Sequence, residues 1–459
     1  MSFSSLEFIF IFFPVFISLY LLVPNKYKNI ILVLASIIFY YIGVKNPIYM
    51  LLLILSLIFN YILGLIIDIS KHKKLLLILG IIVNFGSLFV FKYFDFFSKS
   101  ICNLYSANPV ILNLALPLGI SFYTFQIVSY IVDVYRGKTK SEKSFIDFTA
   151  YAIMFPKFLS GPITTYPECK EYLKSKKISI SNIEKGIIYF VIGLSYKVLL
   201  ANRIGGIWSN ITAVGFDSIS TPLAIIGLVA FSLQLYFDFQ GYSVMAIGIA
   251  KIMGLDLPKN FDHPYLSLSM TEFWRRWHMT LGNWFKEYLY FPLGGSKKGT
   301  LLTIRNLLIV WLFTGLWHGA DWNFVIWGLS IFIIIVIEKL FLKKYLDKYP
   351  ILGHLYMIIL IPLSWMIFAI NDLNSIKTYF SSITKFALNP DYPNDYIQYI
   401  KDYGLFLVLG ILFSTRIPQI IHNKNKFKWI EKIAIFILFW LSVYCLCKES
   451  NDPFMYFKF

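Results

Sequence analysis

A succession of apolar runs along this 459-residue chain constrains its fold more than any other feature. A helix of about 20 apolar residues crosses the hydrocarbon core of a bilayer. Lipid offers the backbone no hydrogen-bond partners, so a chain crosses it as helices or as a closed barrel. The sequence predicts an all-α polytopic membrane protein, with apolar runs at 6–23, 29–44, 48–67, 75–91, 114–132, 187–201, 223–250, 307–317, 322–341, 351–370, 404–421 and 432–447.

Composition excludes several other classes of protein. The chain is 58% hydrophobic and 15% charged, whereas a soluble domain is about 45–50% apolar and about 25% charged. So much apolar surface also excludes a disordered chain. Lys and Arg outnumber Asp and Glu by 42 to 25, but they cluster in short loops between the runs, so no nucleic-acid partner is needed to explain them. Four scattered cysteines predict neither a disulfide scaffold nor a metal site.

The positions of the basic residues predict an orientation. No positive residue precedes the first run, whereas Lys26 and Lys28 follow it, which places the N-terminus outside a cell membrane. Alternation then puts the basic loops near 71–74 and 136–143 inside, and the long loop 371–403, which has no basic excess, outside. The first run is not a cleavable signal peptide, because no charged segment precedes it. Residues 1–459 contain no repeat or linker and are expected to form one integral-membrane domain.

Residues 145–186 and 251–306 break this alternation, and we expect interfacial or re-entrant helices there. Within Ser267–Tyr290, Ser269 and Glu272 form a capping-box pattern that predicts the start of a helix. An apolar stripe at helical spacing follows, made of Phe273, Trp277, Leu281, Trp284 and Tyr288, whereas Arg275, Arg276, Asn283 and Lys286 lie off the stripe. His278 lies on the shoulder of the stripe. Such a histidine is more often a structural hydrogen-bond partner than a catalyst.

Residues 307–329 hold a second histidine. A helix that begins at Arg305 or Asn306 would carry His318 about 18 Å inward, near the middle of the hydrocarbon layer. The ring must then face the protein interior, either hydrogen-bonded between helices or as a general base. Asp238 and Gln240 also lie within an apolar run and need partners, so packing and site-lining roles are both open for them.

Several segments together resemble the membrane-bound O-acyltransferase superfamily, in its alginate O-acetyltransferase-like branch. They are LPLGISFYTFQ (116–126), FPKFLSGPI (155–163), YFDFQGYS (236–243), FWRRWHMTLGNWF (273–285) and TGLWHGADWNFVIWG (314–328). The resemblance spans almost the whole chain. It implies a ring of about 11–13 transmembrane helices, with re-entrant and interfacial helices, around a central funnel. It also implies that His318 and His278 are catalytic.

The function implied is transfer of an acyl group, most often acetyl, from a cytoplasmic thioester such as acetyl-CoA. The acceptor implied is a hydroxyl of a cell-envelope polysaccharide, or of a secreted SGNH-type partner that acetylates it. Basic residues would attract the phosphates of such a donor. The candidates for donor contact are Arg275, Arg276, Asn283 and Lys286, and those for lining the funnel are Asp238, Gln240, Trp317 and Asp321. His278 and Asn283 are also candidates for stabilising the oxyanion.

No tightly bound cofactor or metal is expected. Two other functions stay open at this point. One is D-alanyl transfer to teichoic acid, which would use a carrier protein as donor. The other is a transporter whose histidines are structural, although the absence of inverted repeats speaks against it.

Overall fold

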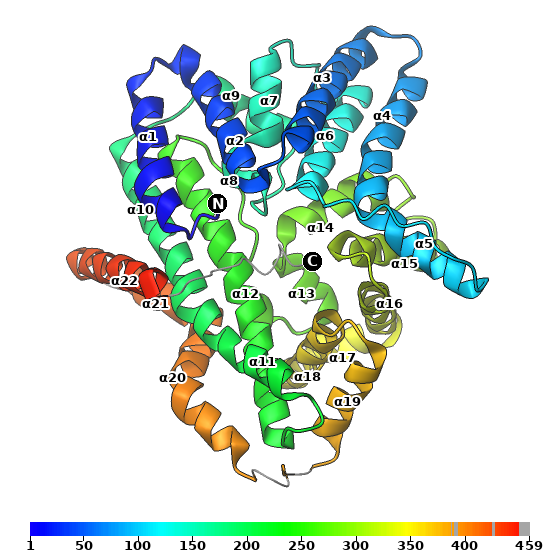
Figure 1. Cartoon of the computed structure of the whole chain (residues 1–459), viewed down its shortest axis with the longest axis vertical. Helices are drawn as coiled ribbons and strands as arrows, with labels where there is room; N and C mark the ends of the chain where they lie inside the picture. Colours follow the sequence, from blue (N-terminus) through cyan, green and yellow to red (C-terminus); the bar gives the residue numbers. More distant parts are fainter. Residues whose placement is uncertain (387, 390–392, 425–426, 449–459) are drawn as a thin grey trace. The chain divides into compact units, whose positions relative to one another are not determined.

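The computed structural model describes residues 1–386, 388–389, 393–424 and 427–448, and in these ranges all regular structure is helical (Figure 1). The all-α prediction is confirmed. Ten described helices are long and apolar enough to cross a membrane, and the shorter Phe8–Leu22 is also apolar. The ten are Asn25–Val44, Pro47–Ile69, Lys73–Leu104, Ile180–Val214, Thr221–Ile252, Thr300–His318, Trp322–Lys348, Pro350–Ala369, Asp395–Ser414 and Lys428–Lys448.

The chain divides into two compact units. The first comprises Met1–Phe190, Ser243–Lys259 and Lys286–Tyr288. Its helices include α1 (Phe13–Leu22), α2 (Lys28–Val44), α3 (Pro47–Ile69), α4 (Lys73–Leu88), α5 (Phe94–Leu104), α6 (Ile120–Tyr135), α7 (Phe145–Ile153), α8 (Phe155–Phe158), α9 (Tyr166–Lys174) and most of α10 (Ile180–Ser195). Helix α6 packs on α3 and α4, and α2 packs on α7 (Figure 1). The stretch 145–186, expected to hold interfacial or re-entrant pieces, supplies the short helices α7 to α9.

Helix α6 explains why the predicted span at 114–132 is not among these ten helices. The apolar run 114–132 yields a helix of only 16 residues, because the chain turns at Gly119, whose φ is +70°. A Cβ at Gly119 would lie 2.8 Å from the carbonyl oxygen of Phe158, so glycine suits this turn. All but two residues of α6 are buried. Its apolar composition therefore reflects burial in protein on all sides.

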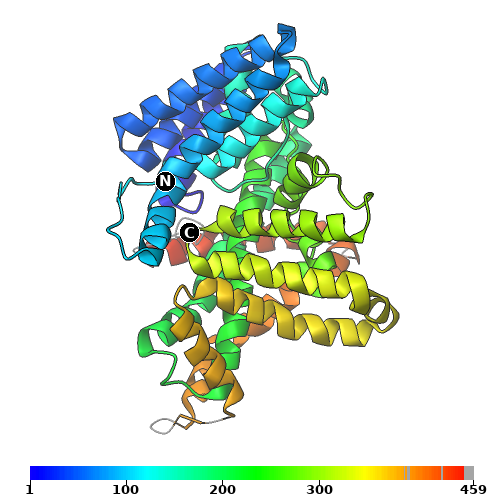
Figure 2. The same ribbon diagram turned by 90° about the vertical axis from the view of Figure 1, so that its right-hand side faces the viewer.

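The second unit comprises Val191–Tyr242, Asn260–Phe285 and Leu289–Phe459. Its helices include α11 (Asn202–Val214), α12 (Thr221–Ile252) up to Tyr242, α13 (Met270–Arg276), α14 (Met279–Phe285), α15 (Thr300–His318), α16 (Trp322–Ile337), α17 (Lys343–Lys348), α18 (Pro350–Ala369), α19 (Leu373–Thr384), α20 (Asp395–Ser414), α21 (Ile417–Lys424) and α22 (Lys428–Lys448). Helix α16 packs on both α15 and α18, and Figure 2 shows these three side by side. Helix α13 also contacts α16, so this unit brings the two histidine-containing segments together.

Candidate active site

His318 is the last residue of α15. This helix begins at Thr300, directly after Gly299, whose φ is +94°. The expected start at Arg305 or Asn306 is therefore five or six residues too late. At 1.5 Å per residue, His318 lies about 27 Å along the helix rather than about 18 Å. The ring thus stands at the end of a membrane-length helix, next to the turn into α16, and not halfway along it.

Two glycines let α15 and α16 approach each other closely. A Cβ on Gly315 would lie 2.4 Å from the carbonyl oxygen of Phe324, and one on Gly328 would lie 2.5 Å from that of Trp311. Real Cβ atoms do not approach backbone oxygens so closely, so any side chain at these positions would push the helices apart. This close packing extends along α15 from Trp311 to Gly315, three residues before His318, and holds this end of the helix against α16.

Aromatic rings enclose His318, which is only 6% exposed. The centroid of its imidazole lies 5.0 Å from Trp317, 5.1 Å from Trp327 and 5.3 Å from Phe368, each in an edge-to-face arrangement. These neighbours come from α15, α16 and α18. Edge-to-face contact is a favourable geometry for aromatic pairs. The imidazole is therefore held in a defined place and shielded from bulk water.

The segment around His278 is not the single helix that its apolar stripe predicts. The predicted start is confirmed, because Ser269 accepts a hydrogen bond from the Glu272 N–H and α13 begins at Met270. Helix α13 ends at Arg276, however, and α14 begins at Met279. Between them His278 has a φ of +42°, a left-handed conformation that costs a non-glycine residue roughly 1–3 kcal/mol.

Asn260 explains this break. Its side-chain oxygen accepts hydrogen bonds from the backbone N–H and the hydroxyl of Thr280, at 3.3 and 2.9 Å, and so satisfies the first turn of α14. Its carbonyl oxygen accepts from the Met279 N–H at 2.8 Å. A continuous helix would lose these bonds. Asn260 lies outside the predicted helix, so the periodicity of that segment alone could not reveal the break.

His278 is 2% exposed, and its Nδ1 lies 3.0 Å from Oδ1 of Asn260. Its ring contacts Phe239 of α12 at 4.7 Å and Trp317 of α15 at 5.8 Å between centroids. Trp317 therefore touches both histidines. Two segments that lie far apart in the sequence, 273–285 and 314–328, meet at this indole. The structure thus brings together His278, His318 and Trp317, while their catalytic and site-lining roles remain predictions.

Burial also sets the charge of His278, which lies outside the membrane-length helices. It lowers the pKa of His278 to about 3, because a buried charge loses its hydration. The ring is therefore neutral at physiological pH. A neutral imidazole has one N–H donor and one nitrogen acceptor, and which is which depends on its hydrogen bonds.

Other candidate lining residues have evident structural partners. Asp238 forms an ion pair with Lys197 at 2.7 Å, and both side chains are almost fully buried. Asp321 caps α16 by accepting a hydrogen bond from the Trp322 N–H at 2.7 Å. Gln240 is half-buried on α12. For Asp238 and Asp321 the structure supplies packing roles that need no substrate.

The candidate donor contacts are more exposed. Arg275 and Asn283 are exposed, and Arg276 is half-buried and pairs with Glu272 at 2.5 Å. Lys286 is also exposed, but it belongs to the first unit, whereas the other three belong to the second. Arg275 and Asn283 are therefore accessible to a charged ligand, and their contact with a donor remains a prediction.

Glu338 is a buried residue that sequence reasoning missed. It begins the π-helical turn that follows α16, and it is 1% exposed. Its carboxylate accepts hydrogen bonds from the backbone N–H groups of Met270 and Thr271, at 2.5 and 2.9 Å, and from the hydroxyls of Thr271 and Tyr356. It thereby holds the N-terminus of α13. A carboxylate inside an apolar run was the available signal, because such a group needs partners.

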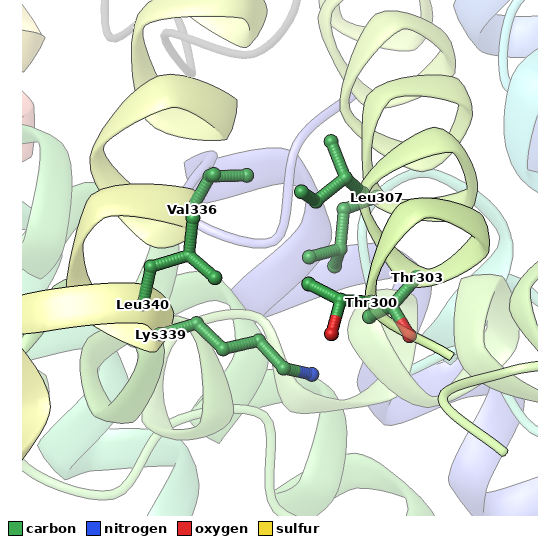
Figure 3. A pocket seen from close by; sticks show the side chains of 7 residues that line it. Thr300, Thr303, Leu307, Val336, Lys339 and Leu340 are labelled. Carbon is green, nitrogen blue, oxygen red and sulfur yellow. The ribbon is translucent and has the colours of Figure 1, made fainter. Parts of the chain in front are cut away.

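A small pocket lies between the start of α15 and the end of α16, and Figure 3 shows Lys339 extending toward Thr300 across it. Its lining residues are Thr300, Thr303, Ile304, Leu307, Val336, Lys339 and Leu340. They come from the start of α15 and the region where α16 ends, whereas His318 lies at the other end of this hairpin. Neither histidine lines this pocket. Within the described ranges, no group of three or more His, Cys, Asp or Glu side chains is placed to hold a metal ion.

The chain is similar to several known proteins. Over its whole length the chain is 32% identical to a probable alginate O-acetylase of Pseudomonas putida and 33% identical to a peptidoglycan O-acetyltransferase of Helicobacter pylori, and it covers 100% and 97% of them. It is 30% identical to a teichoic acid D-alanyltransferase of Bacillus subtilis, but over only 52% of this chain and 62% of that protein. A model of the membrane-bound O-acyltransferase family matches residues 138–374, which include both histidines. The chain belongs to the membrane-bound O-acyltransferase family and is a multi-pass membrane acyltransferase.

Proposed function

We propose that this protein transfers an acetyl group from a cytoplasmic thioester donor to a hydroxyl of a cell-envelope polysaccharide, or of a secreted SGNH-type protein that acetylates the polymer. The observation that carries the proposal is the convergence of His278 and His318 on the ring of Trp317. The full-length similarity to proteins named for O-acetylation supports acetyl as the acyl group. The shorter match to a D-alanyltransferase makes that reaction the less favoured alternative.

In the proposed reaction the acceptor hydroxyl attacks the carbonyl carbon of the thioester, and His318 takes the proton of that hydroxyl. The tetrahedral intermediate then collapses and the carbon–sulfur bond breaks. His318 returns its proton to the departing sulfur, which leaves as a thiol. An imidazole suits both steps, because its ordinary pKa lies near neutral pH. The aromatic enclosure supports this role, since excluding water limits hydrolysis of the thioester.

We place the protein in the cytoplasmic membrane as one domain over residues 1–459, with its N-terminus outside. The donor, acetyl-CoA in this proposal, binds from the cytoplasmic side. The candidates for contact with its phosphates are Arg275, Arg276, Asn283 and Lys286, three of which carry positive charge. The acceptor reaches His318 from the outer face of the membrane, through a funnel whose lining includes Trp317 and Gln240.

The proposal is tested with His318→Ala. We expect envelope O-acetyl ester to disappear while the amount of protein in the membrane stays normal. His354→Ala is the matched control, because His354 is exposed on the neighbouring helix α18, and this variant should keep the wild-type ester content. Ester content unchanged in His318→Ala would overturn the proposed role of this ring.

The donor is tested separately with purified protein in lipid vesicles. We expect radiolabelled acetyl to move from acetyl-CoA to an added acceptor, and His318→Ala to abolish this transfer. Transfer that requires a D-alanyl carrier protein, with none from acetyl-CoA, would favour the alternative reaction instead.

A further inference from the structure

The amide of Asn260 is almost fully buried, at 1% exposure, beneath the break between α13 and α14. Its Oδ1 lies 3.3 Å from the backbone nitrogen of Thr280, 2.9 Å from the Thr280 hydroxyl and 3.0 Å from Nδ1 of His278. One oxygen therefore faces both the first turn of α14 and the imidazole ring. This shared contact determines which nitrogen of the His278 ring carries the hydrogen.

The orientation of the amide follows from chemistry. A backbone N–H can only donate, so the Asn260 atom that faces the Thr280 nitrogen must be the oxygen and not the NH₂ group. The same oxygen faces Nδ1 of His278, so Nδ1 must carry a hydrogen to donate. In a neutral imidazole the other nitrogen then has only its lone pair. The ring geometry thus assigns the proton to Nδ1 and the lone pair to Nε2.

The surroundings of His278 agree with a neutral ring. Across the described ranges no carboxylate forms an ion pair with it, and its aromatic neighbours include Phe239 and Trp317. Burial lowers its pKa, as described above. Nε2 is buried and has no hydrogen-bond partner among the described residues. A buried acceptor without a protein partner is a candidate contact for a bound molecule.

We propose that Asn260 is a positioning residue that holds the His278 proton on Nδ1 and so leaves Nε2 as an acceptor. This inference rests on the proposed acyl transfer for its meaning in catalysis. A ring in this tautomer cannot donate a hydrogen bond from Nε2 to the oxyanion, which is one of the roles that the sequence left open. It instead accepts a hydrogen bond from a donor group of the acceptor other than the hydroxyl that gives its proton to His318, and so orients that molecule for attack.

The direct test is ¹⁵N NMR of the histidine-labelled, full-length protein in micelles without substrate. His278→Asn identifies the resonances of His278, and Asn is a suitable replacement because it tolerates positive φ better than most residues. We expect Nδ1 to be protonated and Nε2 to be unprotonated at neutral pH. A proton on Nε2 would overturn the inference. The tautomer is measured without any activity assay. The tautomer inference can therefore be wrong while the acyltransferase proposal is right, and the acyltransferase proposal can be wrong while the tautomer inference is right.

Two substitutions at Asn260 test its part in the tautomer. Asn260→Leu removes the acceptor, and we expect a mixture of the two tautomers and a fall of at least about tenfold in kcat, with the donor KM unchanged. In alkaline buffer Asn260→Asp restores an acceptor oxygen, so the Nδ1 proton and part of kcat should return. If Asn260→Leu kept both the wild-type tautomer and kcat, Asn260 would have no positioning role.

Thr280→Val is the matched control for loss of packing. It removes the hydroxyl that shares the Asn260 oxygen but keeps the backbone N–H that orients the amide. We expect the His278 tautomer to stay unchanged in this variant. A tautomer lost equally in Thr280→Val would show that general disorder of the segment, and not the Asn260 oxygen, controls the proton. If Asn260→Leu does not fold, the wild-type spectrum and Asn260→Asp still decide the question.

Discussion

The buried pair of Lys197 and Asp238 allows a structural role to be separated from a catalytic one. Lys197 Nζ lies 2.7 Å from the Asp238 carboxylate, and the two side chains are 4% and 2% exposed. Lys197 also donates a hydrogen bond to Asn202 at 2.9 Å. Both ends of the pair belong to membrane-length helices, Ile180–Val214 and Thr221–Ile252. Asp238 was a candidate lining residue in the sequence, so the pair offers a test of that role.

Asp238→Asn keeps the shape of the side chain and removes its charge. Lys197 then loses its ion pair with Asp238 in a buried site. Breaking a buried pair from one side typically costs about 3–5 kcal/mol, whereas replacing both partners by apolar groups is often neutral or stabilising. We therefore expect Asp238→Asn to lower the free energy of unfolding by about 3–5 kcal/mol. The double variant Lys197→Met/Asp238→Leu should recover most of this loss.

The assay is unfolding of the purified protein in mixed micelles by added SDS, with helicity followed by circular dichroism. Acetyl transfer is measured on the same samples. If Asp238 acts only through Lys197, the double variant is both stable and active. A double variant that is stable but inactive would show that Asp238 also serves the site. Exposed ion pairs contribute at most about 1 kcal/mol in the median case. A fall of less than about 1 kcal/mol in the free energy of unfolding for Asp238→Asn would therefore refute the view that each buried charge needs the other.

Two further predictions concern the placement of the histidines. Gly315→Ala should separate α15 from α16, and so lower the free energy of unfolding by about 1–3 kcal/mol and reduce acetyl transfer. Gly86→Ala on α4, where an added Cβ meets nothing within 4 Å, should change neither quantity. SDS unfolding measures stability and the ester product measures acetyl transfer, and equal behaviour of the two variants would contradict the packing argument. Glu338→Ala should lower the free energy of unfolding by about 1–3 kcal/mol for each backbone N–H of α13 that loses its acceptor, and should lower kcat without changing the donor KM. Asp347→Ala is the control, because Asp347 is exposed. An unchanged kcat in Glu338→Ala would show that the hydrogen bonds of Glu338 to α13 do not affect His278.

Features that depend on local pattern were predictable from the sequence. Long apolar runs such as 48–67 and 223–250 became membrane-length helices, because burial in lipid or protein requires continuous apolar composition. The N-cap of α13 at Ser269 was also predictable, since its hydrogen bond lies within four residues of sequence. The grouping of both histidines followed from the family resemblance and not from spacing.

Features that depend on distant contacts were not predictable. The stripe from Phe273 to Tyr288 indicated one helix, and the break at His278 depends on Asn260, which precedes it by 18 residues. The run 114–132 looked like a span, but α6 is short and buried on nearly every side, which periodicity cannot distinguish from burial in lipid. The start of α15 depends on Gly299, whose positive φ the surrounding apolar pattern did not reveal.

The meeting of main chains at Gly315 and Gly328 also bears on how this protein can evolve. Main-chain atoms rather than side chains form the contact there. Substitutions at other positions leave these main-chain atoms unchanged, so nearly all of them should leave the position of the His318 imidazole unchanged. The outward residues of the hairpin, such as Phe313 and Ile333, are exposed. We therefore expect these exposed positions to drift among homologues and adapt to different bilayers, while the placement of His318 against α16 stays the same.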